Sequence, residues 1–329
     1  MKKIINEPNS VVADTLEGLS LAEPTLSYSD EMNVIYKKER TDKVGLVSGG
    51  GAGHEPAQAG YVGEGMLDAS VSGNVFASPG PESILEGIRK ADNGKGVLLI
   101  ITNYSGDIMN FSMAKELAEL EGIEIEDVIV KDDVAVPDST FSTGRRGIAG
   151  TVLIHKIAGA KAQMGCSLLE VKAAAEKAIS NTRTMGMSMS SCIIPGVGTP
   201  IFSIGANEME IGMGVHGEPG IERTGIKSSR EIAEILVTKI LDDIDYIGSD
   251  VALMVNGLGG TSLMELYILN KDVHELLESK NVNIHRTFVG NFMTSMEMAG
   301  CSVTLMKLDD ELKTLIDYPC NTPALKVIS

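Results

Sequence analysis

The stretch Lys43–Pro56, KVGLVSGGGAGHEP, places an apolar run directly before three consecutive glycines and the ionisable residues His54 and Glu55. Residues 43–48 predict a buried strand, and the glycines predict a tight turn at its carboxyl end. Glycines allow backbone N–H groups to approach a ligand closely, and open α/β sheets bind ligands at the carboxyl ends of their strands. We therefore interpret this turn as a binding site, the alternatives being a nucleotide-binding loop or a turn without a ligand. It is not a P-loop, because no Gly-Lys-Ser/Thr follows the glycines.

Outward from this stretch, short apolar runs alternate with helical patterns. Gly96–Ile101 and Asp127–Val130 are continuous apolar runs of the kind found in strands that are buried on both faces. The helical patterns cover Pro81–Ala91, Met109–Glu121 and Gly150–Met164. Strands and helices in alternation predict a mostly parallel sheet that is covered by helices.

The pattern changes near Thr184, where methionines recur at every second residue in TMGMSMSS. Glu208–Val215 repeats this alternation, with apolar side chains on one face and glutamates and glycines on the other. Such alternation predicts strands of an antiparallel or mixed sheet with one open face. We therefore predict an α/β fold in two domains: a mostly parallel α/β sheet domain over residues 1–184, and a second, mixed-sheet α/β domain over residues 185–329.

The composition excludes several classes of partner. With 28 Lys and Arg against 45 Asp and Glu in 329 residues, the chain has a formal net charge of −17. This charge argues against nucleic acid and anionic membranes as partners, since both attract basic proteins. The first residues lack the apolar run of a signal peptide, and no window approaches 18 uninterrupted apolar residues, so we expect a cytoplasmic protein without a membrane span. The cysteines show no CxxC spacing and are expected to be buried free thiols (Cys166, Cys192, Cys301 and Cys320).

Two further motifs carry ionisable residues. Asp107 in TNYSGD follows the apolar run at residues 96–101, so it is either a catalytic carboxylate at the carboxyl end of a strand or the N-cap of a helix. His216 in HGEPG follows a predicted strand, where it can act as acid, base or nucleophile, or stand as a surface histidine in a turn.

Other candidates carry weaker hypotheses. A metal site built from His54, Glu55, His216 and Glu218 is conceivable, but residues two apart in a proline-containing loop converge poorly on a tetrahedral ion, and we expect no metal. Arg145 and Arg146 in TGRRG can hold an anion, although a solvated turn or a structural ion pair is the better interpretation. The remaining histidines are interpreted as structural or solvated (His155, His274 and His285).

Several segments together resemble one family. SGGGAGHEP, GNVFASPGP, NYSGD, TGRRG, NEMEIGMGVHGEPG and NGLGGTSLMELY follow in order over nearly the whole chain. They resemble the K subunits of dihydroxyacetone kinases of the phosphotransferase-system type, the DhaK family.

The resemblance implies a site. The residue matching the family's covalent histidine is His216, whose ring nitrogen adds to the ketone as a hemiaminal, and the proton-transferring residues match His54 and Asp107. The substrate-binding positions match Gly50, Gly51, Gly53 and Ser78, and Thr102 stands where many members have a lysine. Ala52 and Gly80 also depart from common family residues.

The resemblance also implies partners. It predicts a homodimer that binds dihydroxyacetone, or a similar short ketose, and presents a primary hydroxyl to a nucleotide-carrying L subunit. ADP or ATP and Mg²⁺ are expected on that subunit, with phosphoenolpyruvate as the phosphoryl source, and no cofactor is expected on this chain. Two alternatives stay open: a non-catalytic paralogue that acts as co-activator of a transcription regulator, and a kinase subunit for another short ketose. Without the resemblance, the residues also fit a sugar-phosphate or nucleotide-binding enzyme with His216 as acid or base.

Overall fold

The computed structural model describes residues 2–138 and 144–328, so Thr143, the first residue of the TGRRG motif, lies outside it. The first of its two six-stranded sheets has the order β1-β2-β4-β3-β5-β6. Neighbours from β4 to β6 pair in parallel, and β1 and β2 add an antiparallel edge. The predicted mostly parallel sheet is thus confirmed. Its strands are β1 (Leu26–Ser29), β2 (Val34–Lys37), β3 (Gly45–Ala52), β4 (Ala69–Val75), β5 (Val97–Thr102) and β6 (Ile125–Val130).

The second sheet is mixed, as expected, with the order β11-β10-β12-β7-β8-β9. Strands β10 and β11 pair in parallel, and the other described neighbours pair antiparallel. Its strands are β7 (Thr182–Ser188), β8 (Glu208–Ile211), β9 (Glu222–Gly225), β10 (Asp250–Gly257), β11 (Asn283–Gly290) and β12 (Gly300–Leu308), and β13 (Cys320–Asn321) pairs with β14 (Lys326–Val327) near the C-terminus.

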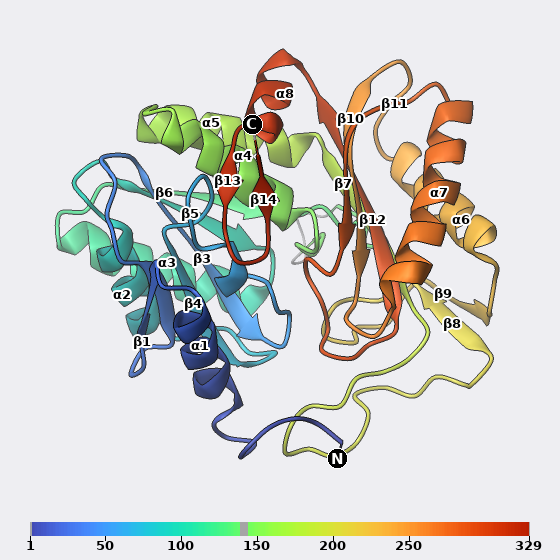
Figure 1. The fold of residues 1–329 in the computed structure, drawn as a ribbon, viewed down its shortest axis with the longest axis horizontal. Coiled ribbons are helices and arrows are strands. Elements are labelled where there is room, and N and C mark those ends of the chain that lie inside the picture. Colours follow the sequence, from blue (N-terminus) through green and yellow to red (C-terminus); the bar gives the residue numbers. More distant parts are fainter. Residues whose placement is uncertain (1, 139–143, 329) are drawn as a thin grey trace.

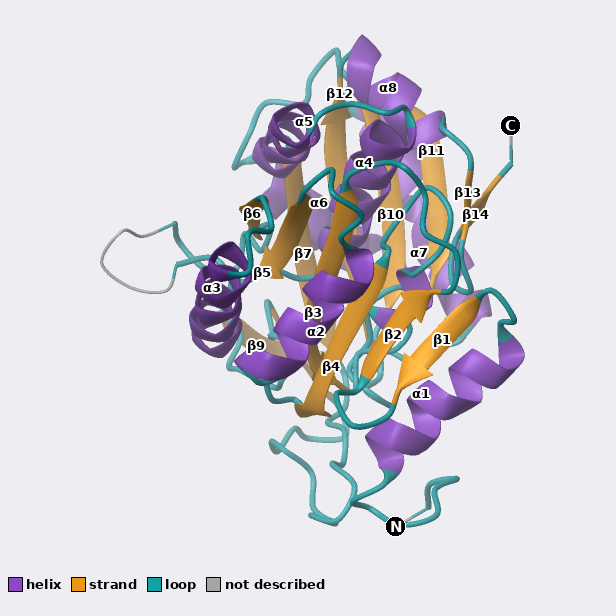
Figure 2. Cartoon of the chain, turned by 90° about the vertical axis from the view of Figure 1, so that its left-hand side faces the viewer, coloured by secondary structure: helices purple, strands orange, loops and turns teal. Residues whose placement is uncertain are grey.

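Helices form layers outside and between the two sheets (Figure 1). Helices α2 (Pro81–Ala91) and α3 (Ser105–Leu120) cover the outer face of the first sheet, which Figure 2 turns toward the viewer. Helices α6 (Ser229–Leu241) and α7 (Leu263–Ser279) pack on the outer face of the second. Between the sheets lie α4 (Thr151–Gln163), α5 (Leu168–Ser180) and α8 (Asp310–Asp317), while α1 (Val11–Ala22) and a short 3₁₀ helix (Ala59–Tyr61) belong to the N-terminal part.

Local sequence explains where these helices begin. Pro81 occupies the first turn of α2, where its missing N–H is not needed. Helices α5, α6 and α7 each begin with a Ser-x-x-Glu capping box, which satisfies two N-terminal backbone donors. Helix α4 is apolar almost all round, and it is buried in a core that joins residues of both sheets, from Leu98 of β5 to Met254 of β10.

Two predicted elements differ from the structure. The glycine run does not form a turn, because β3 continues to Ala52 and pairs Gly50 with Ser72 and Gly51 with Gly73 of β4. Strand β8 ends at Ile211 rather than Val215, since Gly212 takes a positive φ of 76° and starts a loop. Its polar face is also closed, because Glu210 is buried and binds Arg223.

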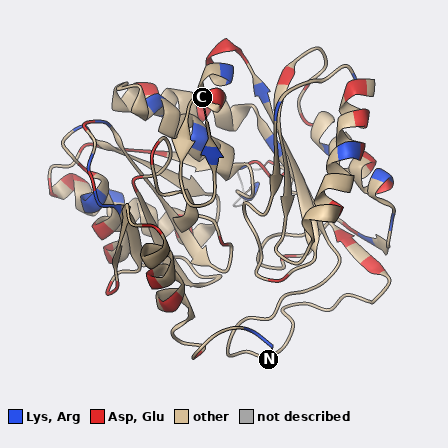
Figure 3. Cartoon of the chain, in the orientation of Figure 1, with Lys and Arg blue, Asp and Glu red and all other residues tan. Residues whose placement is uncertain are grey.

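The predicted division into domains stays a prediction. The first sheet ends at Val130 and the second begins at Thr182, so the predicted boundary falls inside β7. All four cysteines are unpaired; three are buried and Cys166 is half-buried. Acidic side chains are spread over the outer helices, including α1, α2 and α7 (Figure 3). Within the described ranges, none of the helices combines the length and the apolar character needed to cross a membrane.

Candidate functional site

His54, Asp107 and His216 meet in one small pocket, although they lie far apart in the sequence. The pocket has a volume of about 20 Å³ and lies where β3 and β5 end and the loop after β8 reaches across from the second sheet. It therefore combines the carboxyl ends of parallel strands with a histidine from the other half of the chain. Its lining consists of Gly50, Gly51, His54, Ala57, Gln58, Thr102, Tyr104, Asp107, Val215, His216 and Met293.

The two histidines face each other through their Nε2 atoms, which are 3.0 Å apart. His54 is buried, and its Nδ1 is 2.7 Å from the carbonyl oxygen of Thr294. A ring nitrogen must carry hydrogen to bond a carbonyl, so Nδ1 is the protonated nitrogen of neutral His54 and its Nε2 carries the lone pair. Burial, together with the charge of His216, lowers the pKa of His54 to about 3.

Glu218 orients the ring of His216 from the other side. Its Oε1 is 3.0 Å from His216 Nδ1, and its Oε2 accepts the backbone N–H of His216 at 3.0 Å. Burial alone would raise the pKa of Glu218, but the hydrogen bond and charge of His216 outweigh it and lower the pKa to about 2. The ring of His216 also lies edge-on to Tyr104, with 4.8 Å between the ring centroids. The ring is therefore fixed by contacts and is not a mobile surface side chain.

The Asp107 carboxylate has one oxygen that can still accept a hydrogen bond. It lies in the first turn of α3 rather than at its N-cap, which is Tyr104. Its Oδ2 accepts the hydroxyl of Thr102 at 3.0 Å, while its buried Oδ1 has no hydrogen-bond partner among the described residues. Burial raises the pKa of Asp107, and hydrogen bonds from Ser78 and Thr102 partly oppose this. A ligand hydroxyl would satisfy Oδ1.

The consecutive glycines have different roles. A Cβ on Gly49 would stand 2.4 Å from the carbonyl oxygen of Val71, and one on Gly51 would stand 2.7 Å from the backbone nitrogen of Ala77, so both glycines are needed for close packing. A Cβ on Gly50 would face the pocket, with the Oδ2 of Asp107 at 3.7 Å. Gly50 is thus the glycine that gives a ligand room.

Gly53 and Ser78 are not part of the pocket lining. The N–H of Gly53 donates to the carboxylate of Glu55 at 3.1 Å, so it is already engaged. Ser78 touches the site through Asp107. The expected contacts of these two residues with substrate stay predictions, and this geometry favours the contact of Ser78 over that of Gly53.

A further segment, which no sequence motif predicted, contacts the loops of both histidines. Thr294 accepts the ring N–H of His54 with its carbonyl oxygen, and its backbone N–H donates to the His54 carbonyl oxygen at 3.1 Å. The hydroxyl of Ser295 donates to the carbonyl oxygen of Val215, next to His216, at 2.6 Å. These contacts run largely through backbone atoms, so no residue pattern could have signalled them. Tyr104 and Glu218 lie inside quoted motifs and could have been chosen there.

His54, Glu55, His216 and Glu218 do not converge on one point, because the carboxylate of Glu55 bonds the backbone N–H of Gly53 instead. Across residues 2–138 and 144–328, no group of three or more potential ligands lies close enough to hold an ion. Arg145 and Arg146 form structural ion pairs with Asp243 and Asp133. The other histidines also make no contact with the pocket: His274 bonds Thr287, His285 bonds Asp317, and His155 is buried in α4.

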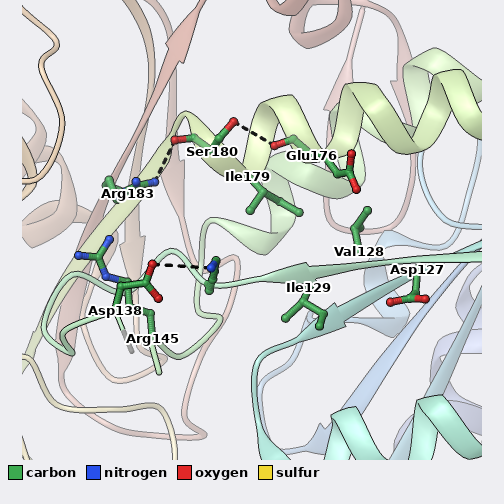
Figure 4. A pocket seen from close by; sticks show the side chains of 10 residues that line it. Asp127, Val128, Ile129, Asp138, Arg145, Glu176, Ile179, Ser180 and Arg183 are labelled. Atoms are coloured by element: carbon green, nitrogen blue, oxygen red, sulfur yellow. Dashed lines mark hydrogen bonds and ion pairs between the residues drawn. The ribbon is translucent and has the colours of Figure 1, made fainter. Parts of the chain in front are cut away.

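A larger groove of about 470 Å³ lies between β6 and α5, where Arg183 bonds the carbonyl oxygen of Ser180 and Asp138 pairs with Lys131 (Figure 4). It contains neither pocket histidine. The smaller pocket is the candidate site, because it collects the groups with perturbed pKa values and an unsatisfied acceptor.

Comparisons with known proteins show the family. The family model described as Dak1 domain matches residues 17–324. The chain is 52% identical to a protein of Listeria innocua named "PTS-dependent dihydroxyacetone kinase 1, dihydroxyacetone-binding subunit DhaK", over 94% of this chain and 95% of that one. A solved structure titled "Dihydroxyacetone kinase operon co-activator Dha-DhaQ" superposes with a TM-score of 0.89 at 37% identity, covering 97% and 98% of the two chains. The dihydroxyacetone kinase of C. freundii superposes with a TM-score of 0.90 at 34% identity, over 99% of this chain and 60% of that one.

Proposed function

Because the chain belongs to the Dak1 family, we propose that it is the dihydroxyacetone-binding subunit of a phosphoenolpyruvate-dependent dihydroxyacetone kinase. The observation that carries this proposal is the pair of facing Nε2 atoms, 3.0 Å apart, in a pocket that also holds the unsatisfied carboxylate oxygen of Asp107. A nucleophilic nitrogen, an acid for the carbonyl oxygen and a base for a hydroxyl are the groups that hemiaminal formation and phosphorylation need.

The hydrogen bonds favour one proton shared between the two rings. His54 uses an N–H at Nδ1 for Thr294, and His216 uses one at Nδ1 for Glu218. If both Nε2 atoms carried lone pairs, these would repel at 3.0 Å, so one proton lies between them. The rings together therefore carry one positive charge, which the carboxylate of Glu218 compensates.

Hemiaminal formation needs no proton from outside this pair. The shared proton moves to Nε2 of His54, which frees the lone pair of His216 Nε2 to bond the carbonyl carbon of the ketone. The π electrons of the C=O bond go to its oxygen, which takes the proton from His54. The product carries a hydroxyl on that carbon and a cationic His216 ring whose Nδ1–H still faces Glu218. The low pKa of His54 suits it to give this proton away.

Asp107 is the proposed base for phosphorylation. Its Oδ1 can accept a primary hydroxyl of the bound ketone, and its raised pKa brings it closer to the pKa that favours proton transfer near neutral pH. Gly50 and Gly51 leave space beside it, and Thr102 holds its other oxygen. Covalent attachment fixes the hydroxyl in position, which contributes to the rate through orientation.

The phosphoryl donor is proposed to sit on a separate L subunit, as ADP or ATP with Mg²⁺. Among the described residues, the lining of the pocket includes no lysine or arginine that could hold the phosphates of a nucleotide. We also expect the chain to act in the cytoplasm as a homodimer. Exposed apolar side chains on one side of α7, namely Leu263, Met264, Tyr267 and Ile268, support an association surface, which analytical ultracentrifugation tests.

A second candidate is a ligand-sensing co-activator without turnover. The match to the co-activator structure favours it, since that fold superposes as well as the kinase fold does. The presence of His54, Asp107 and His216 in one pocket favours the kinase subunit. A kinase subunit for another short ketose would use the same groups.

A coupled assay with an L-type subunit tests the proposal. The chain alone with ATP and Mg²⁺ should be nearly inert, and the mixture should phosphorylate dihydroxyacetone within a panel of short ketoses. His216→Ala should lose both the covalent adduct, seen by intact-protein mass spectrometry, and turnover. An adduct without turnover would favour the co-activator, and an adduct that survives His216→Ala would refute the assigned nucleophile.

A further inference from the structure

Arg146 links the first sheet to the loop that carries His216. Its side chain is 11% exposed, and its Nε–H donates to the Oδ2 of Asp133, which follows β6, at 2.7 Å. One terminal nitrogen, Nη2, donates to the carbonyl oxygen of Gly212 at 2.8 Å. Gly212 is the first residue after β8 and opens the loop that leads to His216. The guanidinium group therefore fixes the start of this loop against the end of the first sheet.

The other terminal nitrogen of Arg146 approaches Glu218 without forming an ion pair with it. A Cβ built on Gly214 would stand 2.5 Å from Nη1 of Arg146 and 2.1 Å from Oε2 of Glu218, so both charged groups border the space that the missing side chain of Gly214 leaves open. That carboxylate binds His216 twice, at the backbone N–H and at Nδ1. Four charged or ionisable groups thus follow one another in a row: the His216 imidazole, the Glu218 carboxylate, the Arg146 guanidinium and the Asp133 carboxylate.

The charges in this row alternate. Asp133 is buried, which raises its pKa to about 6 against the opposing charge of Arg146, so it is mostly ionised at neutral pH. With Glu218 ionised as well, the row is neutral overall when the His216 ring is cationic, and carries a net buried negative charge when the ring is neutral. It therefore stabilises the cationic ring that a hemiaminal requires. A lysine could not serve the carboxylate of Asp133 and the carbonyl oxygen of Gly212 in these directions, because the fork of donors is fixed only in arginine.

We propose that Arg146 is a positioning residue for hemiaminal formation. It holds the loop at Gly212, so that Oε1 of Glu218 stays on Nδ1 and His216 presents Nε2 to the ketone, while Arg146 itself lies outside the pocket lining. This role rests on the proposed function, in which His216 bonds the ketone.

Arg146→Lys and Gly214→Ala test the role, with Arg145→Lys as the matched control. Arg145 receives the same change one residue earlier, but its guanidinium pairs with Asp243, at 2.9 Å between Nη1 and Oδ2. Gly214→Ala keeps every charge, and since the nearest atoms are the ends of flexible side chains, the fold should tolerate it. Three quantities are measured: the dihydroxyacetone concentration for half-maximal adduct, the low-field ¹H resonance of His216 Nδ1–H in the free protein, identified by its loss in His216→Asn, and the unfolding temperature.

Arg146→Lys and Gly214→Ala should raise the half-maximal concentration about 10- to 100-fold, the effect expected for misplacing one hydrogen bond to a charged group. Both should also move the Nδ1–H resonance upfield, whereas Arg145→Lys should change neither, even where it lowers the unfolding temperature. Equal effects of the two lysine variants on the adduct, or unchanged readouts in Gly214→Ala, would overturn the assignment. If the wild-type protein forms no adduct, the proposed function fails, and an Nδ1–H resonance unchanged in Arg146→Lys would separately refute the positioning role.

Discussion

Gly50 offers a way to block the pocket without disturbing the fold. Its missing side chain faces the pocket, and the nearest described atom to an added Cβ, outside the adjacent residues, is the Oδ2 of Asp107 at 3.7 Å. Gly49→Ala and Gly51→Ala differ sharply, because each Cβ would meet backbone atoms at 2.4 Å and 2.7 Å. We therefore expect Gly50→Ala to fold normally and to bind the ketone poorly.

The magnitude follows from where the added methyl group would stand. It would lie 3.7 Å from the Oδ2 of Asp107, beside the carboxylate that a ketone hydroxyl must reach. The ketone would lose its hydrogen bond to Asp107, about 1.5–3 kcal/mol, and would crowd the methyl group at a cost of about 1–3 kcal/mol. Together these terms weaken adduct formation by about 10²- to 10⁴-fold. Alanine in a strand is about 0.5–1 kcal/mol more stable than glycine, so the unfolding temperature should rise by about 1 °C.

Intact-protein mass spectrometry over a range of dihydroxyacetone concentrations, with thermal unfolding of the same samples, checks both effects. Gly50→Ala should separate them, with a weaker adduct and an equal or higher unfolding temperature. Gly51→Ala should lose stability because its Cβ meets the backbone of Ala77. A Gly50→Ala protein that forms the adduct as readily as wild type would show that the ketone does not occupy this pocket.

Asp107→Asn should keep the adduct but lower turnover with an L-type subunit by about 10²- to 10⁴-fold, because the amide cannot accept the hydroxyl proton; parallel adduct and turnover measurements test this. His155→Leu should flatten the acid side of the stability curve. Burial lowers the pKa of His155 to about 3, so between pH 6.5 and 3 the unfolded chain binds a proton that the fold excludes, and stability falls by up to about 1.4 kcal/mol per pH unit as pH falls. Urea unfolding at pH 7 and pH 4.5 should show a smaller loss in the variant, and equal losses would contradict the assignment. Lys156, with its pKa lowered by burial to about 8, should add stability as pH rises from 8 to 10.5, since the unfolded chain still binds a proton there that the folded chain has lost. Lys156→Met should remove this rise in the free energy of unfolding. Urea unfolding of both proteins at pH 8 and pH 10 measures it, and an equal rise in the variant would contradict the prediction.

Much of the fold could be predicted from the sequence where one pattern decided the structure. Pro81–Ala91 was predicted with the observed bounds, because proline starts the helix and the apolar spacing continues to its end. The prediction of a turn at the glycine run was wrong, because glycine occurs both in turns and in strands that pack closely against their neighbours. Here the close neighbours are Val71 and Ala77, which belong to other segments of the chain. The alternating pattern at Glu208–Val215 overestimated β8, because Gly212 ends the strand through its backbone and not through polarity.

The candidate site could be predicted as residues but not as an arrangement. His54, Asp107 and His216 each follow a strand or a predicted strand, and the resemblance to a family assigned their roles. The sequence did not reveal that the histidine rings face each other, because His216 comes from the other sheet and its orientation depends on Glu218 and Tyr104. For Arg146 it favoured a solvated turn or a structural ion pair, and the ion pair is correct for Asp133, but this interpretation leaves out the contact with the carbonyl oxygen of Gly212.

The two pocket histidines depend on a third segment that contacts both of their loops. Residues 294–296 take the ring N–H of His54, donate backbone N–H groups to the carbonyl oxygens of His54 and Gly53, and hold Val215 through Ser295. A shift of this segment would therefore move both rings and alter the 3.0 Å separation on which the shared proton depends. The distance between the histidines is set by the packing of the two sheets, and the reactivity of His216 is a property of the assembled chain rather than of the HGEPG motif.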